Sequence, residues 1–256
     1  MFGEIWNACG EKLIFVCSEV MKNKGFVDGT RESALEIVGS VAEAHPKLLK
    51  ENAEHMKTQF FPSLCVMMTK VEHEDSLEDW YAVEEEDVFL SNDIASHCAE
   101  SLERLVTKLG EAMTISCLTQ LINEMVKAPE WQTRHAGFLC MGMISEVCEK
   151  SFTSNLANVM QLHSPGLQDE HPRVRFQALM SMGRLMNFCC PEVQKVYHAD
   201  LMPLLLRRMV EEEQIKMKSQ VVSCAVSFVT NLTGTKEDEI DEDAKEEGKQ
   251  LIMIYS

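Results

Sequence analysis

The sequence predicts an all-α fold, a right-handed solenoid built from antiparallel helix pairs. Three observations lead to this prediction. Only 12 Gly and 7 Pro occur among 256 residues, which is too few turn-forming residues for an all-β fold. Apolar residues make up 45% of the chain, with 17 Met, and this composition favours helices around a sizeable core. The third observation is a spaced pattern of residues that recurs along the chain.

The pattern is an Arg, then a small residue at +3, apolar residues at +4 and +7, Gly at +8 and an apolar residue at +10. It starts at Arg31, Arg134 and Arg175, and weaker copies start at Cys98 and around Val221. The three full copies are Arg31, Ala34, Leu35, Val38, Gly39, Val41; Arg134, Gly137, Phe138, Met141, Gly142, Ile144; and Arg175, Ala178, Leu179, Met182, Gly183, Leu185. The last two are 41 residues apart, within the spacing of HEAT and armadillo repeats. We therefore expect residues 1–256 to form a single segment of HEAT-repeat (armadillo-like) solenoid with about five repeats.

Each repeat is expected to consist of two helices. The first helices are predicted at 29–44, 93–109, 130–148, 171–189 and 215–231, and the second helices at 47–71, 112–127, 153–167 and 192–210. Pro172 opens one first helix, where a missing N–H costs nothing. Residues 4–22 resemble a second helix, and residues 240–256 begin another. Neither end resembles a polar capping repeat, so we expect a piece of a longer solenoid.

The glycines of the pattern are interpreted as packing residues. Gly142 and Gly183 are expected where first helices pass close to a neighbour, as is Gly39. Replacing Gly183 with Leu is then expected to overpack the contact and to cost roughly 1–3 kcal/mol.

Negative charge is concentrated in two segments. The chain carries 24 Lys and Arg against 41 Asp and Glu, a formal net charge of −17. Residues 72–93 hold ten acids without Lys or Arg, and the linker 236–247 holds eight acids and two Lys. The insertion 72–93 is expected to be a loop between two repeats. The lack of basic clusters argues against nucleic acid as a partner.

The insertion also carries adjacent aromatic residues, Trp80 and Tyr81. We expect this aromatic part to anchor on the solenoid, while Glu84, Glu85, Glu86 and Asp87 project toward the concave face and attract a basic partner. A purely solvated loop is the alternative.

Two segments carry a family resemblance. PEWQTRHAGFLCMGMISEVCEK and LQDEHPRVRFQALMSMGRL resemble the central HEAT repeats of karyopherin-beta nuclear transport receptors, of the importin beta-3 subfamily. The stretch VEHEDSLEDWYAVEEEDVFLSND resembles the acidic loop of that subfamily. The resemblance runs from about residue 29 to 232. Such receptors are several times longer, and the amino-terminal repeats that supply much of the Ran-GTP contact are missing here.

Catalytic and metal-binding patterns are poorly represented. The sequence has no GxGxxG, Walker, HExxH or GxSxG motif, and its 10 Cys and 8 His lack metal-ligand spacing. Buried, reduced thiols of a cytosolic or nuclear protein are the simplest interpretation. A Cys–His pair brought together by the fold stays open. We expect neither an enzyme nor a cofactor, and no segment is apolar for long enough to cross a membrane.

The resemblance implies a nuclear import receptor segment that binds basic cargo signals in Ran-regulated transport. The implied partners are basic cargo, phenylalanine–glycine nucleoporins and, for the full-length receptor only, the Ran GTPase; the implied location is cytoplasm and nucleus, including the nuclear pore. A generic HEAT-repeat scaffold or regulatory subunit is the alternative. Second helices line the concave face of a solenoid, and their acidic ends suit a basic peptide.

The candidate cargo-binding residues outside the insertion are Asn123, Glu124, Asp169, Glu211, Glu212 and Glu213. The positions assigned to repeat structure are Arg31, Gly39, Trp131, Arg134, Gly142, Pro172, Arg175 and Gly183. Two roles are considered for Arg134 and Arg175. Each can hold adjacent repeats together, or it can contact a partner. For Trp131, the two interpretations are packing at a repeat boundary or an apolar patch for phenylalanine–glycine repeats.

Overall fold

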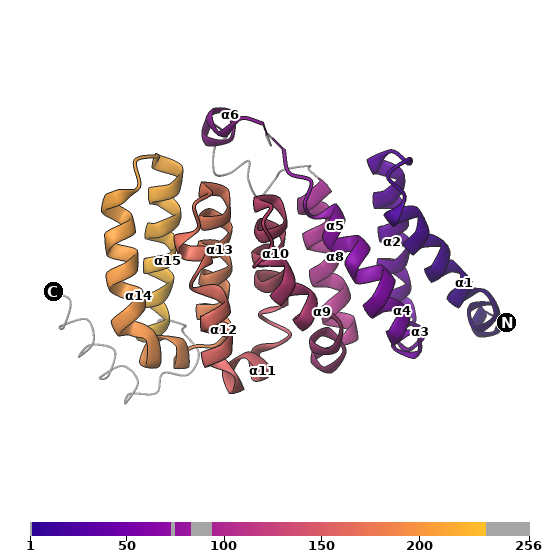
Figure 1. Cartoon of the computed structure of the whole chain (residues 1–256). Coiled ribbons are helices and arrows are strands. Elements are labelled where there is room, and N and C mark those ends of the chain that lie inside the picture. The colour runs from indigo at the N-terminus through magenta and orange to yellow at the C-terminus, as the bar shows by residue number, and fades with distance from the viewer. Residues whose placement is uncertain (1, 73–74, 83–93, 234–256) are drawn as a thin grey trace. The chain divides into compact units, whose positions relative to one another are not determined.

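The computed structural model describes residues 2–72, 75–82 and 94–233, and the regular elements within these ranges are helices (Figure 1). They form two compact units, 1–148 and 149–256. The expected second helix at 240–256 and most of the acidic insertion lie outside the described residues. The all-α prediction is confirmed for the part of the chain that is described.

The first unit contains three helices that carry the repeat pattern. These are α2 (Asp28–Ala44), α8 (Ile94–Leu109) and α10 (Trp131–Ile144). Neighbouring members pack on one another, α2 on α8 and α8 on α10. The other elements of this unit are α1 (Phe2–Lys22), α3 (Pro46–Glu51), α4 (Ala53–His55), η1 (Met56–Phe60), α5 (Phe61–Met67), α6 (Leu77–Ala82) and α9 (Glu111–Met125).

The second unit also contains first helices that pack on one another. Its first helices are α13 (Pro172–Phe188) and α15 (Ile215–Thr233), which pack together, and α14 (Glu192–Glu211) packs on α15. Before α13 come α11 (Glu149–Ser154), α12 (Leu156–His163) and η2 (Gly166–Gln168). Four of the five predicted first helices match to within two residues at each end, while α10 ends four residues before its prediction.

Two predicted second helices are broken, which corrects the expectation of continuous helices at 47–71 and 153–167. At each break an Asn side chain donates to the carbonyl four residues back, Asn52 to Leu48 at 2.9 Å and Asn155 to Ser151 at 3.1 Å. The same two carbonyls also accept the backbone N–H of these Asn residues, and the backbone at both Asn residues leaves helical geometry. Pro62 then lacks the N–H that a helix needs, and a π-helical turn, η1, precedes it.

The core consists of the apolar positions of the pattern. At the +4 and +7 positions, Leu35, Val38, Phe138, Met141, Leu179 and Met182 are at most 3% exposed. Their spacing places both positions on one face of each helix, so burial of that face holds the repeats together. In the fifth copy, Val221, Ala225 and Phe228 are buried, but Val222 and Val229 are exposed.

The packing assignment of the glycines needs a correction. A Cβ atom on Gly183 would have no heavy atom within 4 Å, so Gly183 is not at a close helix contact. A Cβ on Gly39 would meet Nη2 of Arg104 at 3.6 Å, an ordinary contact. The close approach is at Gly137, where a Cβ would lie 2.8 Å from Val126 Cγ1 and 3.0 Å from the backbone nitrogen of Val126. Among these positions, a close contact therefore requires glycine at Gly137, the +3 position of the α10 repeat, because Met125 and Val126 pass close to the helix there.

Candidate functional site

The end of α9 carries two exposed residues of the predicted binding set. Asn123 and Glu124 are both exposed in its last turn. The Lys127 ammonium donates to Asn123 Oδ1 at 2.7 Å, and the Gln120 amide donates to Glu124 Oε1 at 3.0 Å. Each of these acceptors keeps a second lone pair, so a cationic side chain from outside can still be bound.

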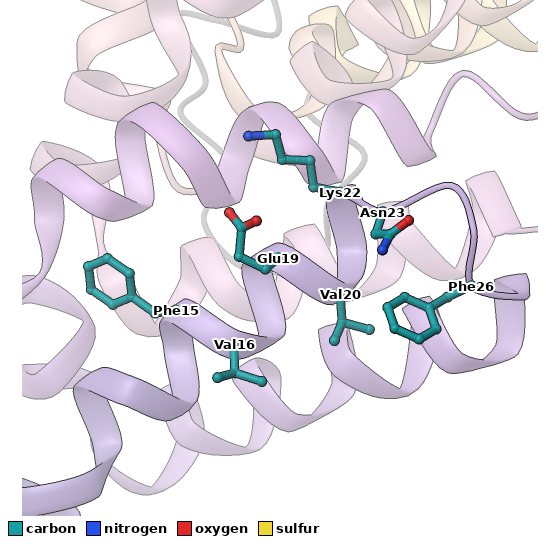
Figure 2. A pocket seen from close by; sticks show the side chains of 7 residues that line it. All are labelled: Phe15, Val16, Glu19, Val20, Lys22, Asn23 and Phe26. Carbon is teal, nitrogen blue, oxygen red and sulfur yellow. The ribbon is translucent and has the colours of Figure 1, made fainter.

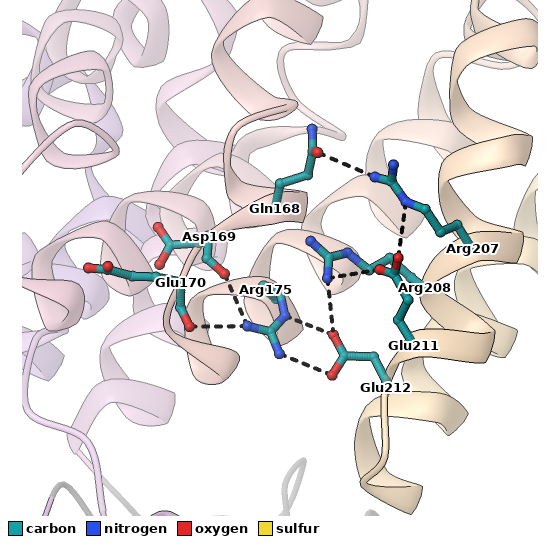
Figure 3. A network of polar contacts seen from close by, with 8 residues as sticks. All are labelled: Gln168, Asp169, Glu170, Arg175, Arg207, Arg208, Glu211 and Glu212. Carbon is teal, nitrogen blue, oxygen red and sulfur yellow. Dashed lines mark hydrogen bonds and ion pairs between the residues drawn. The ribbon is translucent and has the colours of Figure 1, made fainter.

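Arg175 organises the candidate residues of the second unit (Figure 3). Its Nη1 donates to the main-chain carbonyls of Asp169 and Glu170, at 3.0 and 3.2 Å. Its Nε and Nη2 bind both oxygens of Glu212, at 2.8 and 3.0 Å. Arg175 lies in the first turn of α13 and Glu212 directly follows α14, so this two-pronged ion pair joins the start of α13 to the turn between α14 and α15.

Glu212 is not part of an exposed acidic surface, although the sequence suggests one. Its side chain is 9% exposed and is committed to Arg175. Glu211 is exposed, but it lies 3.7 Å from Arg207 and 3.5 Å from Arg208. The acids at the end of α14 therefore belong to a mixed network with arginines rather than to a continuous negative patch.

Two further acids in this unit have different surroundings. Glu213 is exposed in the turn before α15. Asp169 is half-buried, and its Oδ1 accepts the backbone N–H of His171 at 2.9 Å, which shapes the entry into α13. Of the two, Glu213 has the geometry of a residue that can reach a partner.

The arginines of the repeat pattern share one structural role. Nη1 of Arg134 donates to the carbonyls of Ala128 and Pro129, at 3.1 and 2.7 Å, with the same residue spacing as the Arg175 contacts. Arg31 is 1% exposed, and its Nε donates to the Met21 carbonyl at 2.8 Å. These contacts satisfy carbonyls in the chain that leads into each first helix. Trp131 is half-buried at the start of α10, with its ring 6.4 Å from that of His135.

A polar ladder formed by Arg104, Glu36, Glu43 and Ser101 joins α2 and α8. It was not predicted from the sequence. Arg104 binds Glu36 at 3.0 Å and Glu43 at 2.9 Å, and the Ser101 hydroxyl donates to Glu36 at 2.8 Å. Burial raises the pKa of the Glu36 carboxyl, but the hydrogen bonds from Ser101 and Arg104 outweigh it and lower that pKa overall. The ladder joins residues more than 60 positions apart in sequence, and no local motif marks it.

An open pocket lies on α1 and the turn that follows it (Figure 2). Its apolar part is formed by Phe15, Val16, Val20 and Phe26, with Glu19, Lys22 and Asn23 around it. Phe26 and Val27 occupy positions that carry Pro129 and Glu130 in the α10 repeat. The apolar character of this turn is therefore particular to the first repeat.

Sulfur atoms gather inside the first unit. The Cys65 and Cys140 thiols lie 3.7 Å apart, and the Cys140 thiol is 3.5 Å from the Met68 sulfur. The hydrogen bond with Cys65 and burial raise the pKa of Cys140 well above its usual value, so it stays a thiol. Within the described ranges, no group of three or more His, Cys, Asp or Glu is arranged to hold a metal ion. Nor is any described helix both long and apolar enough to cross a bilayer.

The acidic insertion is described only in part. Trp80, on the short helix α6, is 7% exposed, and its ring lies 4.9 Å from the Tyr81 ring. Anchoring of this aromatic pair on the solenoid stays a prediction. Glu84, Glu85, Glu86 and Asp87 lie outside the described residues. Their projection toward a partner stays a prediction.

Comparison with known proteins shows a similarity to importins. A family model described as Importin repeat matches residues 23–117. Importin subunit beta-3 of Saccharomyces cerevisiae is 24% identical over 220 residues, which cover 85% of this chain and 20% of that protein. The chain is similar to HEAT-repeat proteins of the karyopherin-beta family. A Dictyostelium discoideum protein named probable importin-5 homolog is 27% identical over 172 residues, 65% of this chain and 15% of that protein.

Solved structures with the same fold include those of Kap121p. Kap121p bound to Pho4p and Kap121p bound to RanGTP each match with a TM-score of 0.81 and 21% identity. Each match covers 98% of this chain and 24% of the Kap121p chain. The predicted HEAT-repeat fold is therefore confirmed, and the chain spans about a quarter of these structures and a fifth of importin beta-3.

Proposed function

We propose that this segment belongs to a nuclear import receptor and binds basic cargo signals through its second helices. The observation that carries the proposal is the relationship to importin subunit beta-3 across 85% of the chain. The similar solved structures include Kap121p bound to Pho4p and Kap121p bound to Ste12p, and each match covers 98% of this chain. The role is one of binding, without a catalytic step.

The cargo contacts are proposed at the acids that the geometry leaves accessible. Asn123 and Glu124 at the end of α9 offer an amide oxygen and a carboxylate next to each other. Glu213 offers a second carboxylate, and Glu84 to Asp87 add four more in the insertion. Asp169 and Glu211 are at most secondary contacts because they already hold His171 and the arginines of α14. Lysine side chains of an extended peptide are the partners that this chemistry suits.

Other partners are proposed for the receptor as a whole. Kap121p structures bound to RanGTP and to Nup53p support Ran and nucleoporins as partners. Phenylalanine–glycine repeats as the nucleoporin element, and a location that includes the nuclear pore, are part of the same proposal. Ran binding is assigned to the full-length receptor, since the chain covers only 24% of the Kap121p that is bound to RanGTP.

The cargo proposal is tested by titrating a fluorescent Lys-rich import peptide with the 256-residue chain at low and moderate salt. The pair Asn123→Ala and Glu124→Gln is expected to weaken binding several-fold and to flatten its salt dependence, because screening acts over about 8 Å at physiological ionic strength. Glu100→Gln, an exposed acid on the first helix α8, is the matched control and is expected to leave affinity unchanged.

A parent chain that does not bind the peptide at either salt would overturn the cargo proposal. Equal effects of Glu124→Gln and Glu100→Gln would show a general charge effect instead of a site at the end of α9.

A further inference from the structure

Helix α14 carries an apolar stripe on its exposed face. Its members recur at intervals of three, four, three and four residues, which is the spacing of one face of a helix. They are Val196, Ala199, Pro203, Leu206 and Val210, and all five are exposed. For Val196, Leu206 and Val210 the exposed fractions are 63, 44 and 82%. Single apolar residues on a surface are ordinary, but five in one line along a helix indicate a contact face.

The stripe points away from the core of its own unit. The buried residues of α14 include Gln194, Leu201 and Leu205, and α14 packs on α15 (Figure 1). Val196 and Pro203 each come two residues after a buried residue, and two residues correspond to about 200° of helical turn. The stripe therefore lies almost opposite the buried face, and the described part of the chain leaves it uncovered.

The second helices α9 and α12 have no such stripe. The exposed residues of α9 are Ala112, Ser116, Thr119, Gln120, Asn123 and Glu124, and those of α12 are Ala157, Asn158 and Gln161. None of them is an apolar residue larger than alanine. The stripe of α14 is therefore not a general property of second helices, and a partner particular to α14 is the simplest reason for it.

Charge on one flank of the stripe favours a second copy of the same helix. Asp200 and Arg207 are exposed and seven residues apart, so they share that flank. In an antiparallel pair with Pro203 at the two-fold axis, Asp200 lies three residues from the axis and Arg207 lies four. Asp200 then faces Arg207 of the partner subunit, whereas a parallel pair would bring like charges together. The contact of Arg207 with Glu211, 3.7 Å between exposed side chains, is weak enough to be exchanged.

The same register matches the apolar side chains. Val196 and Val210 each lie seven residues from Pro203, so they meet across the pair. Ala199 and Leu206 lie four and three residues from it, so a small side chain meets a large one. Pro203 lacks an N–H, and its ring adds apolar surface at the centre. The stripe is therefore complementary to itself in the antiparallel arrangement.

We propose that the α14 stripe is a dimerisation surface, on which two copies of this chain associate through antiparallel α14 helices. The stripe is about 21 Å long and one helix wide, which is less than the roughly 800 Å² per partner of a standard interface. We therefore expect a reversible dimer with a dissociation constant of roughly 10–100 μM. This inference does not depend on cargo binding, so it stands or fails separately from the proposed function.

The test is sedimentation equilibrium of the 256-residue chain over a concentration range that brackets this dissociation constant. The average mass is expected to rise with concentration from that of one chain toward that of two. Val196→Asp is expected to weaken the association at least about tenfold, because it places a charge in the contact. Val226→Asp, at a 57% exposed valine of α15, is the matched control and is expected to leave the association unchanged.

A charge exchange tests the antiparallel register. Asp200→Arg places an arginine opposite Arg207 of the partner subunit, and Arg207→Asp places an aspartate opposite Asp200 of the partner subunit. Each change alone is expected to weaken the association several-fold. The two changes together restore opposite charges and are expected to recover it, which a general loss of folding would not allow.

A parent chain that stays monomeric across the concentration range would overturn the proposal. Equal weakening by Val196→Asp and Val226→Asp would overturn the assignment to α14. Failure of the combined charge exchange to recover what each single change loses would overturn the antiparallel pairing.

Discussion

At the scale of single residues, the small positions of the repeat pattern are not equivalent. Gly137 lies against Met125 and Val126, where a methyl group would overlap both residues. Gly183 has the same helical conformation but open space around it. Helix propensity alone favours Ala over Gly by about 1 kcal/mol at both positions. Local packing therefore decides whether replacing the glycine with Ala raises or lowers the free energy of unfolding.

Gly137→Ala is predicted to destabilise the protein by roughly 1–3 kcal/mol, because overpacking outweighs the propensity gain. Gly183→Ala is predicted to be neutral or to stabilise by up to about 1 kcal/mol. Chemical denaturation of the two variants beside the parent measures both effects. Equal effects in the two variants would contradict the packing assignment of Gly137.

A buried histidine makes stability depend on pH. Burial lowers the pKa of His163 to about 4, whereas an unfolded His titrates near 6.5. Between these values the unfolded state binds the extra proton, so the free energy of unfolding is predicted to fall as pH drops from about 6.5 to about 4. The contribution of this group amounts to at most about 3 kcal/mol, and the full loss is reached below pH 4.

Denaturation at a series of pH values checks this dependence. His163→Gln is expected to flatten the profile between pH 6.5 and 4, whatever its effect on absolute stability. His198→Gln, at a partly exposed position on α14, is the control and is expected to keep the slope of the parent. A profile of His163→Gln that parallels the parent would refute the assignment.

At the scale of elements, arginines of the pattern hold the start of a first helix to the chain before it. Arg134 and Arg175 both donate to main-chain carbonyls five and six residues back. Arg175 also binds Glu212, 37 residues ahead, in the turn between α14 and α15. A tie between adjacent repeats stays a prediction for Arg175, and the contact with Glu212 supports it.

Arg175→Ala is predicted to destabilise the second unit by about 3–5 kcal/mol, because it leaves the 9% exposed Glu212 carboxylate without its main partner. Arg207→Ala removes a guanidinium that is 54% exposed and is predicted to cost less than about 1 kcal/mol. Urea denaturation distinguishes the two variants. Similar midpoints would mean that the Arg175 pair does not hold the repeats together.

At the scale of the whole molecule, the reactivity of the ten cysteines shows whether both units are folded. All ten are free thiols, and eight of them are buried, while Cys9 is exposed and Cys190 is partly exposed. Burial raises the pKa of Cys148 and of Cys224 to about 12, which makes both unreactive at neutral pH. The buried cysteines are therefore reduced thiols that stay protonated while their unit is folded.

A thiol reagent such as Ellman's reagent is predicted to modify only Cys9 and Cys190 rapidly in the folded chain, and all ten cysteines after denaturation. The two phases are measured by absorbance under non-reducing conditions. Rapid modification of more than two thiols would show that one of the units opens in solution.

The sequence by itself determined the helical class, the repeat and the buried register. These properties are local, since spacing along one helix places Leu35 and Val38, or Leu179 and Met182, on one face whatever lies opposite. The right-handed winding and the single solenoid over 1–256 stay predictions. Only the tertiary structure decided which glycine is at a close contact, where Asn52 and Asn155 interrupt their helices, and which acids are accessible. Glu211, Glu212 and Glu213 look alike in sequence, but Arg175 holds Glu212 from 37 positions away and Glu213 remains exposed. A residue's partners across the fold depend on how helices stack, and that stacking is not encoded in the spacing within any one of them.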